Sequence, residues 1–196
     1  MRKPPPDVSE KVHGWFVPLS RGDTTIAGAL DELAAFGLKE KDIPFLVQLI
    51  ENPKYDLPGF DLFHGATDLH THDQIHVLLG RGLLPKDEAF VIGFTMGSTD
   101  LVSATEERLY TFFARNFYPR AYRFSDEDTR VFKDAVRLGF VSDCQPLSKA
   151  NIEALRSLPL REARRRLGIE EELLRAYYAI EKRRYPQSFE SQRLLD

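Results

Sequence analysis

The sequence predicts an all-α protein, folded as one irregular multi-helix domain. Apolar residues recur at helical spacing in one segment after another, capping and stop residues flank those segments, and no convincing run of alternating strand residues occurs. A length of 196 residues suits one domain with small appendages. We expect an N-terminal arm at 1–23, a metal-binding helical domain at 24–169 and a C-terminal helical extension at 170–196.

The sequence of residues 24–65 predicts two helices followed by a loop. Residues 24–38 begin with threonine caps, continue with apolar residues at helical spacing and meet a stop at Gly37. Residues 41–52 predict a second, shorter helix because the following proline cannot continue it. Residues 53–65 are rich in proline and glycine and predict a loop.

The middle of the chain predicts a helical hairpin. We expect helices at Thr67–Leu79 and Lys86–Ser98, joined by a turn at Gly80–Pro85. Gly93 and Gly97 share one face of the second helix, because they are four residues apart. Because glycine has no side chain, we expect a neighbouring helix to pack closely against that face.

Further helices are predicted to the end of the chain. Residues 99–119 form a long amphipathic pattern with Asp100 near its start, and residues 124–140 begin with a capping box of Ser125 and Asp128. The remaining expected helices lie at 147–158, 159–169 and 170–186.

The composition excludes several classes of protein. A net charge of -3 provides no overall positive field for nucleic acid, so no nucleic-acid partner is expected. No apolar run has the length of a membrane-spanning helix, and Cys144 is the single cysteine, which excludes an internal disulfide. We expect a cytoplasmic protein, and leave peripheral attachment to a membrane surface and homo-oligomerisation open.

A basic cluster lies in the predicted 159–169 helix. We expect a solvated face balanced by neighbouring glutamates, with anionic lipid or a protein partner as the alternative. The cluster comprises Arg161, Arg164, Arg165 and Arg166.

Three histidines lie within seven residues of the predicted 67–79 helix. On a helical wheel His72 and His76 fall together on the apolar side, whereas His70 points roughly opposite and is expected at the surface. Two imidazoles one helical turn apart can bind one cation. They can also be core residues bonded to backbone carbonyls, and this alternative stays open.

Two carboxylates strengthen the metal hypothesis. Asp73 lies within the same arc as His76, and the turn after the helix can bring Glu88 back from the next helix. An inward carboxylate beside inward histidines is least costly when a cation lies between them. Because the chain has no cysteine cluster, the sequence predicts a divalent metal site of His72, Asp73, His76 and Glu88.

These four residues resemble the H-D-x-x-H-(eleven residues)-E motif of the coenzyme Q (ubiquinone) biosynthesis family. Around the motif, "HDQIHVLLGRG", "EAFVIGFTMG" and "PLREARRRLGI" are similar to that family's flanking segments, so the resemblance extends over 24–169. It implies a mostly helical, zinc-binding protein that binds a prenylated quinone precursor. It also implies a role as organiser of other quinone-biosynthesis enzymes, or in decarboxylation of the precursor's ring.

A prenylated ligand needs a long apolar groove. Aromatic residues near the predicted site could line it, although aromatic side chains at helical spacing are more often part of the core. The candidate lipid-binding residues are Phe90, Phe94, Phe112, Phe113 and Phe117.

Three functions are therefore distinguished. The first is a zinc-dependent decarboxylase, or a protein that presents the lipid intermediate to such an enzyme. The second is a metal-dependent hydrolase, because the pair His72-Asp73 resembles HD-type phosphohydrolases. The third is a non-catalytic lipid carrier or scaffold in which the metal is structural.

Overall fold

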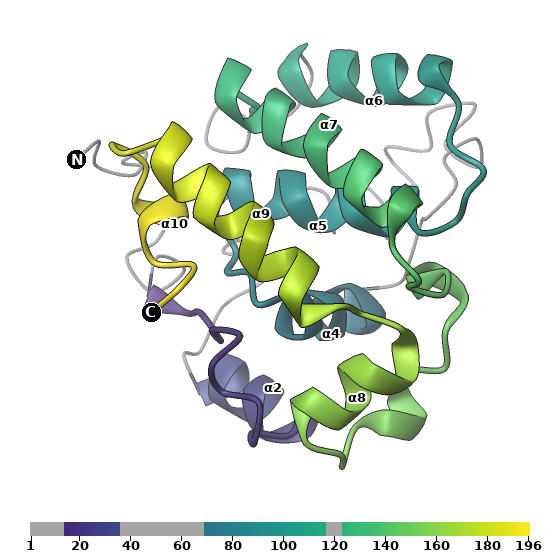
Figure 1. The fold of residues 1–196 in the computed structure, drawn as a ribbon, viewed down its shortest axis with the longest axis vertical. Coiled ribbons are helices and arrows are strands. Elements are labelled where there is room, and N and C mark those ends of the chain that lie inside the picture. Colours follow the sequence, from purple (N-terminus) through teal and green to yellow (C-terminus); the bar gives the residue numbers. More distant parts are fainter. Residues whose placement is uncertain (1–13, 36–68, 117–122) are drawn as a thin grey trace.

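The computed structural model describes residues 14–35, 69–116 and 123–196 and confirms the all-α fold. Within these ranges there are eight α-helices and no β-strand (Figure 1). The helix predicted at 41–52 and the loop predicted at 53–65 lie outside the described residues.

The predicted helical hairpin is present. Helix α4 spans Leu69–Leu79 and helix α5 spans Pro85–Gly97, each within two residues of the prediction over the described part. Pro85 suits the first helical position because its fixed φ and missing N–H cost nothing there. Gly80 ends α4 with a φ of 66°, a left-handed conformation that favours glycine. The turn between the helices is therefore tight, and it brings the start of α5 back toward α4.

Helix α7, Asp126–Val141, packs closely against α5. Gly93 lies against the backbone of Phe132 and Gly97 against that of Val136, so the two helices run in the same direction. A Cβ on either glycine would collide with a carbonyl oxygen of α7. The glycine face predicted from the sequence is thus used for direct backbone contact between helices.

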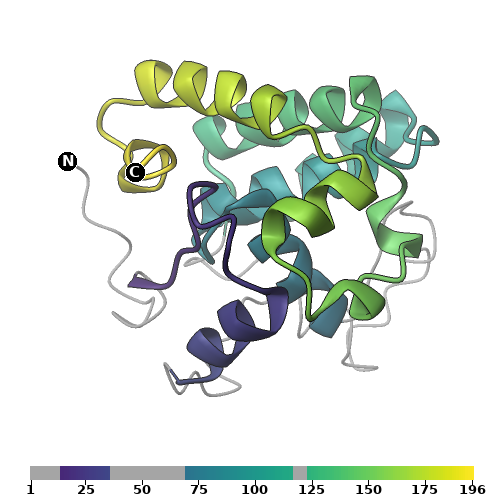
Figure 2. The same cartoon turned by 60° about the horizontal axis from the view of Figure 1, so that its bottom comes forward.

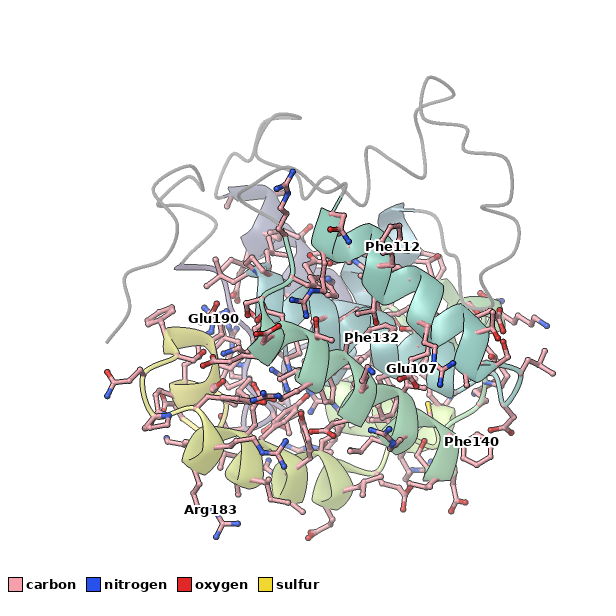
Figure 3. The ribbon with its side chains drawn as sticks, turned by 90° about the horizontal axis from the view of Figure 1, so that it is seen from above. Glu107, Phe112, Phe132, Phe140, Arg183 and Glu190 are labelled. Atoms are coloured by element: carbon pink, nitrogen blue, oxygen red, sulfur yellow. The ribbon has the colours of Figure 1, made fainter. Side chains whose placement is uncertain are left out.

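Helix α6, Ala104–Asn116, covers α7 with a second, smaller aromatic core. The rings of Tyr110 and Phe132 stack with centroids 4.9 Å apart, and Figure 3 shows Phe132 between the two helices. The prediction of a helix from 99 was wrong at its start. Ser103 and Glu106 form the N-terminal cap, because the Ser103 amide donates to the Glu106 carboxylate (2.8 Å).

The remaining helices enclose the hairpin. Helix α9 lies beside α7 in both views (Figures 1 and 2). The rings of Tyr177 and Tyr178 on α9 pack against Phe90 of α5. The helix predicted at 147–158 was wrong, because only two short 3-10 turns form there, at Leu147–Lys149 and Glu153–Leu155. The other helices are α2 (Ile26–Ala35), α8 (Leu160–Leu167), α9 (Glu171–Arg184) and α10 (Phe189–Gln192).

The main core joins distant parts of the chain. Leu174, Tyr178 and Leu194 belong to the same buried cluster as Ile75 and Leu79 of α4. The division of the chain at residue 170 stays a prediction. In the structure, however, the α9–α10 segment (residues 171–194) buries one apolar face, with Leu174, Tyr178 and Leu194, in the core that also contains the helical hairpin.

The basic cluster on α8 differs from the prediction at one position. Arg165 and Arg166 pair with Glu162 at the surface, as expected. Arg164 is instead completely buried, and its guanidinium donates to the carbonyl of Leu78 (2.8 Å) and contacts Glu171 (3.0 Å). It caps the end of α4, where the last carbonyls of a helix have no partner within the helix.

Candidate metal centre

Three of the four predicted ligands meet in the interior. Helix α4 presents His72 and His76 one turn apart, and the first turn of α5 presents Glu88. All three side chains are buried, with exposed fractions of 7%, 0% and 4%. Their nitrogen and oxygen ligand atoms all lie within 4.8 Å of one another, so this group could hold a metal ion.

The separations of the ligand atoms suit a small cation. The two Nε2 atoms of His72 and His76 lie 2.9 Å apart. Glu88 Oε2 lies 3.1 Å from His72 Nε2, and its Oε1 lies 3.3 Å from His76 Nε2. Nitrogen and oxygen ligands about 2.0–2.1 Å from a tetrahedral zinc ion are themselves about 3.3 Å apart. The three residues are therefore close to the arrangement that such an ion requires.

The backbone fixes the tautomer of His76. Its Nδ1 lies 2.7 Å from the carbonyl oxygen of Gly82, which can only accept a hydrogen bond, so Nδ1 carries the proton. In the neutral ring Nε2 then has a free lone pair directed toward His72 and Glu88. A histidine that donates its second ring nitrogen to a carbonyl is the usual arrangement around a bound metal.

The charges of this group are strongly coupled. Burial alone would raise the pKa of Glu88, but the nearby His76 and His72 hold it well below its usual range. Burial alone would lower the pKa of His76, but the charge and hydrogen bond of Glu88 raise it above its ordinary value. The pocket therefore favours a carboxylate that has positive charge beside it, which a divalent cation can provide.

Asp73 and His70 do not belong to the group of three candidate ligands. Asp73 is partly buried on α4, and burial raises its pKa despite the opposing charges of His76 and His72. It does not belong to the group of ligand atoms, so its role as a ligand stays a prediction. His70 is at the surface, as expected, where its Nε2 lies 2.9 Å from Glu153.

The three candidate lipid-binding aromatics whose side chains the structure describes are not gathered into one lining. Phe90 and Phe94 are buried in the main core with ring centroids 6.0 Å apart, and Phe90 also packs against Tyr177 and Tyr178. Phe112 is 54% exposed on α6 (Figure 3). Two further candidates, the Phe113 side chain and Phe117, lie outside the described part of the structure. The lipid groove thus stays a prediction.

A layer of buried charges, not predicted from the sequence, surrounds the turn that follows His76. Arg81 lies between the rings of Phe90 and Tyr178, with its guanidinium carbon 4.0 and 4.3 Å from their centroids. It forms a two-point ion pair with Glu181 of α9, at 3.1 and 2.6 Å. Asp87, directly before the candidate ligand Glu88, accepts from Arg193 (2.6 Å).

One signal for this layer was present in the sequence. Leu174, Tyr177, Tyr178 and Glu181 follow helical spacing along a single stripe, so Glu181 occupies a position that is otherwise apolar. A carboxylate in such a stripe predicts a buried cationic partner, because an unpaired buried charge is too costly. The stripe does not reveal that this partner is Arg81.

Comparisons with known proteins add no relative. No family model matches the chain, and neither a curated protein nor a solved structure does. The resemblance to the coenzyme Q biosynthesis family therefore rests on the motif and its flanking segments alone. Within the described part of the chain, every helix is too short or too polar to cross a bilayer.

Proposed function

We propose that the protein binds a zinc ion, or a similar divalent metal, through His72, His76 and Glu88. The observation that carries this proposal is the buried triangle of two imidazole nitrogens and one carboxylate, with its outer hydrogen bond to Gly82. Two nitrogens and one oxygen form a common ligand set of catalytic zinc sites, which leave a fourth position for a water or a substrate.

We further propose that the fourth position accepts an anionic group of an aromatic acid with a prenyl tail. The support for this substrate class is the motif shared with the coenzyme Q biosynthesis family. Zinc supplies a Lewis acid that can bind a carboxylate or phenolate and lower the pKa of a phenol. The role of this chain is to orient the ring acid for loss of its carboxylate, or to present it to a partner enzyme.

The two imidazoles and the carboxylate hold the site in one geometry. Glu88 neutralises part of the metal's charge, and the carbonyl of Gly82 fixes the ring of His76. Where loss of the carboxylate is coupled to oxidation of the ring carbon, oxygen or a partner enzyme must accept the electrons, because zinc is redox-inert.

Native mass spectrometry with elemental analysis of the freshly purified protein tests the metal site. We expect about one zinc per chain in the wild type and in His70→Ala, which removes a histidine from the same helix but not from the site. In His72→Ala the metal is lost. Wild-type protein that carries no metal and binds none when zinc is added would refute the site.

Binding of a prenylated hydroxybenzoic acid tests the substrate class. We expect the zinc-loaded protein to bind it, and the unprenylated acid to bind at least tenfold more weakly because the tail buries apolar area. Release of carbon dioxide during incubation with the zinc-loaded protein would show decarboxylation. Equal affinity for both acids would contradict a prenyl-binding function but leave the metal site intact.

A structural role of the metal is the second candidate. The observation in its favour is that all three ligands are buried and belong to the two helices of a single hairpin. A metal that only holds α4 against α5 predicts tight zinc binding with no affinity for any ring acid. The carrier or scaffold function would then be detected by restoration of activity to a quinone-biosynthesis assembly that lacks this protein.

A further inference from the structure

The α9–α10 segment covers the turn that connects the proposed metal ligands. The hydroxyl of Tyr178 donates to the carbonyl of Leu79, and Glu181 pairs with Arg81 inside the turn. Arg193 follows α10 and reaches the beginning of α5. Side chains from about 100 positions later in the chain thus surround this turn.

Arg193 contacts the connection between His76 and Glu88 at two points, at Gly82 in its middle and at Asp87 at its end. Its Nη2 donates to Asp87 Oδ2 at 2.6 Å, one residue before the ligand Glu88. The same guanidinium lies directly against Gly82, where a Cβ would collide with it. Gly82 is the residue whose carbonyl accepts the hydrogen bond from His76.

The surroundings of Arg193 hold its guanidinium in place. The guanidinium carbon lies 4.8 Å from the centroid of the Phe16 ring and 5.2 Å from that of Phe189. The side chain of Arg193 is 9% exposed and that of Asp87 is fully buried. A planar guanidinium held by two rings and a carboxylate has little conformational freedom, so it keeps the groups that it contacts at fixed positions.

We propose that Arg193 is a positioning residue for the metal centre. It fixes the Gly82 carbonyl, which orients His76, and it fixes Asp87, which sets the start of α5 and therefore the place of Glu88. The inference rests on the proposed metal binding, and adds that the affinity of the site depends on a residue outside the predicted 24–169 domain. Loss of such supporting contacts typically weakens metal binding about 10–100-fold.

The zinc affinity of Arg193→Met, measured by competition with a chromophoric chelator, tests the proposal. Methionine keeps an apolar stem against the two rings and removes the contacts to Asp87 and Gly82. We expect the dissociation constant to rise about 10–100-fold. In Arg184→Met, which removes an arginine of α9 that pairs with Asp134 at the surface, we expect the wild-type value.

A second control separates positioning from general loss of stability. Val136→Ala leaves a cavity between α5 and α7, so it destabilises the fold without touching the turn. If Arg193 only stabilises the fold, Arg193→Met should lower the unfolding temperature, as Val136→Ala does. The folded Arg193→Met protein should then bind zinc with the wild-type affinity. An unchanged affinity in Arg193→Met, beside tight binding by the wild type, overturns the proposal. Absence of binding by the wild type overturns the metal site itself.

Hydrogen exchange in the wild-type protein gives a test that needs no variant. If Arg193 couples the metal centre to the α9–α10 segment, the coupling free energy is the same in both directions. Bound zinc must then stabilise the α9–α10 segment by as much as the docked segment strengthens zinc binding. We expect zinc to slow exchange at the amides of Ser191 and Gln192 as well as in α4. Slower exchange in α4 with no change at these two amides would contradict the proposal.

Discussion

The buried ion pair of Arg81 and Glu181 gives a sharp prediction about stability. Both side chains have an exposed fraction of 0% and contact each other at two points. Glutamine at position 181 would preserve the shape, but its amide NH2 would face the guanidinium, and both groups are donors. Within the described part of the chain, Arg81 also pairs with Asp87, but at 3.8 Å, and Asp87 already accepts from Arg193 (2.6 Å).

Removing one member of a buried ion pair typically costs ~3–5 kcal/mol, because the other charge is left without a partner away from water. The free energy of unfolding of a domain is ~5–15 kcal/mol, so Glu181→Gln removes a large fraction of it. The variant should unfold about 6–20 °C below the wild type, given ~2–4 °C per kcal/mol at this chain length.

Urea denaturation followed by circular dichroism measures the loss directly. Glu172→Gln is the matched control, because Glu172 is exposed on the same helix, and its effect should stay within ~0.5 kcal/mol. The double variant Arg81→Met with Glu181→Leu should be more stable than Glu181→Gln, because it leaves no unpaired charge. A loss of less than about 1 kcal/mol in Glu181→Gln would refute the reasoning.

Three further predictions concern other parts of the molecule. Burial raises the pKa of Cys144 to about 12, so iodoacetamide at pH 8 should modify the native thiol roughly a thousandfold more slowly than the unfolded one, as followed by mass spectrometry. Ser125→Ala removes the hydroxyl that accepts from the Asp128 amide and should lower the free energy of unfolding by ~0.5–2 kcal/mol in urea denaturation. Zinc affinity should fall as the pH falls, because protons compete for the imidazole. Since the pKa of His76 is raised, the fall should begin above pH 6.5 in calorimetric titrations, and a flat profile between pH 8 and 6 would contradict this.

Local sequence signals predicted the helical hairpin well. Pro85, Gly80 and the glycines of α5 act through their own backbone conformation or size, so their effects can be recognised without knowledge of the partner. The capping box of Ser125 and Asp128 could also be recognised locally, because both residues lie within one helical turn. The start of α6 was misplaced because two local signals compete there, Asp100 and the cap of Ser103 and Glu106, and the structure uses the second. The 147–158 segment has polar and apolar residues at helical spacing, yet it forms only two 3-10 turns.

The inward direction of His72 and His76 was also predictable, since both belong to one helix and the helical period fixes their faces. Glu88 could be placed because only a short turn separates it from them. Arg164, Arg81 and their partners could not be placed this way. Their burial is set by contacts between segments far apart in the chain, and charged side chains ordinarily lie at the surface.

The contact between Arg193 and Asp87 spans 106 positions, and that between Arg81 and Glu181 spans 100. The two helices with the candidate metal ligands, by contrast, lie within one short stretch of sequence. During synthesis, α4 and α5 therefore leave the ribosome long before the groups that neutralise the charges of their turn. Until α9 and α10 have been made, Glu181 and Arg193 cannot pair with Arg81 and Asp87, so these two charges depend on water and on each other. The buried form of this turn therefore cannot be completed before the distant segment has been synthesised.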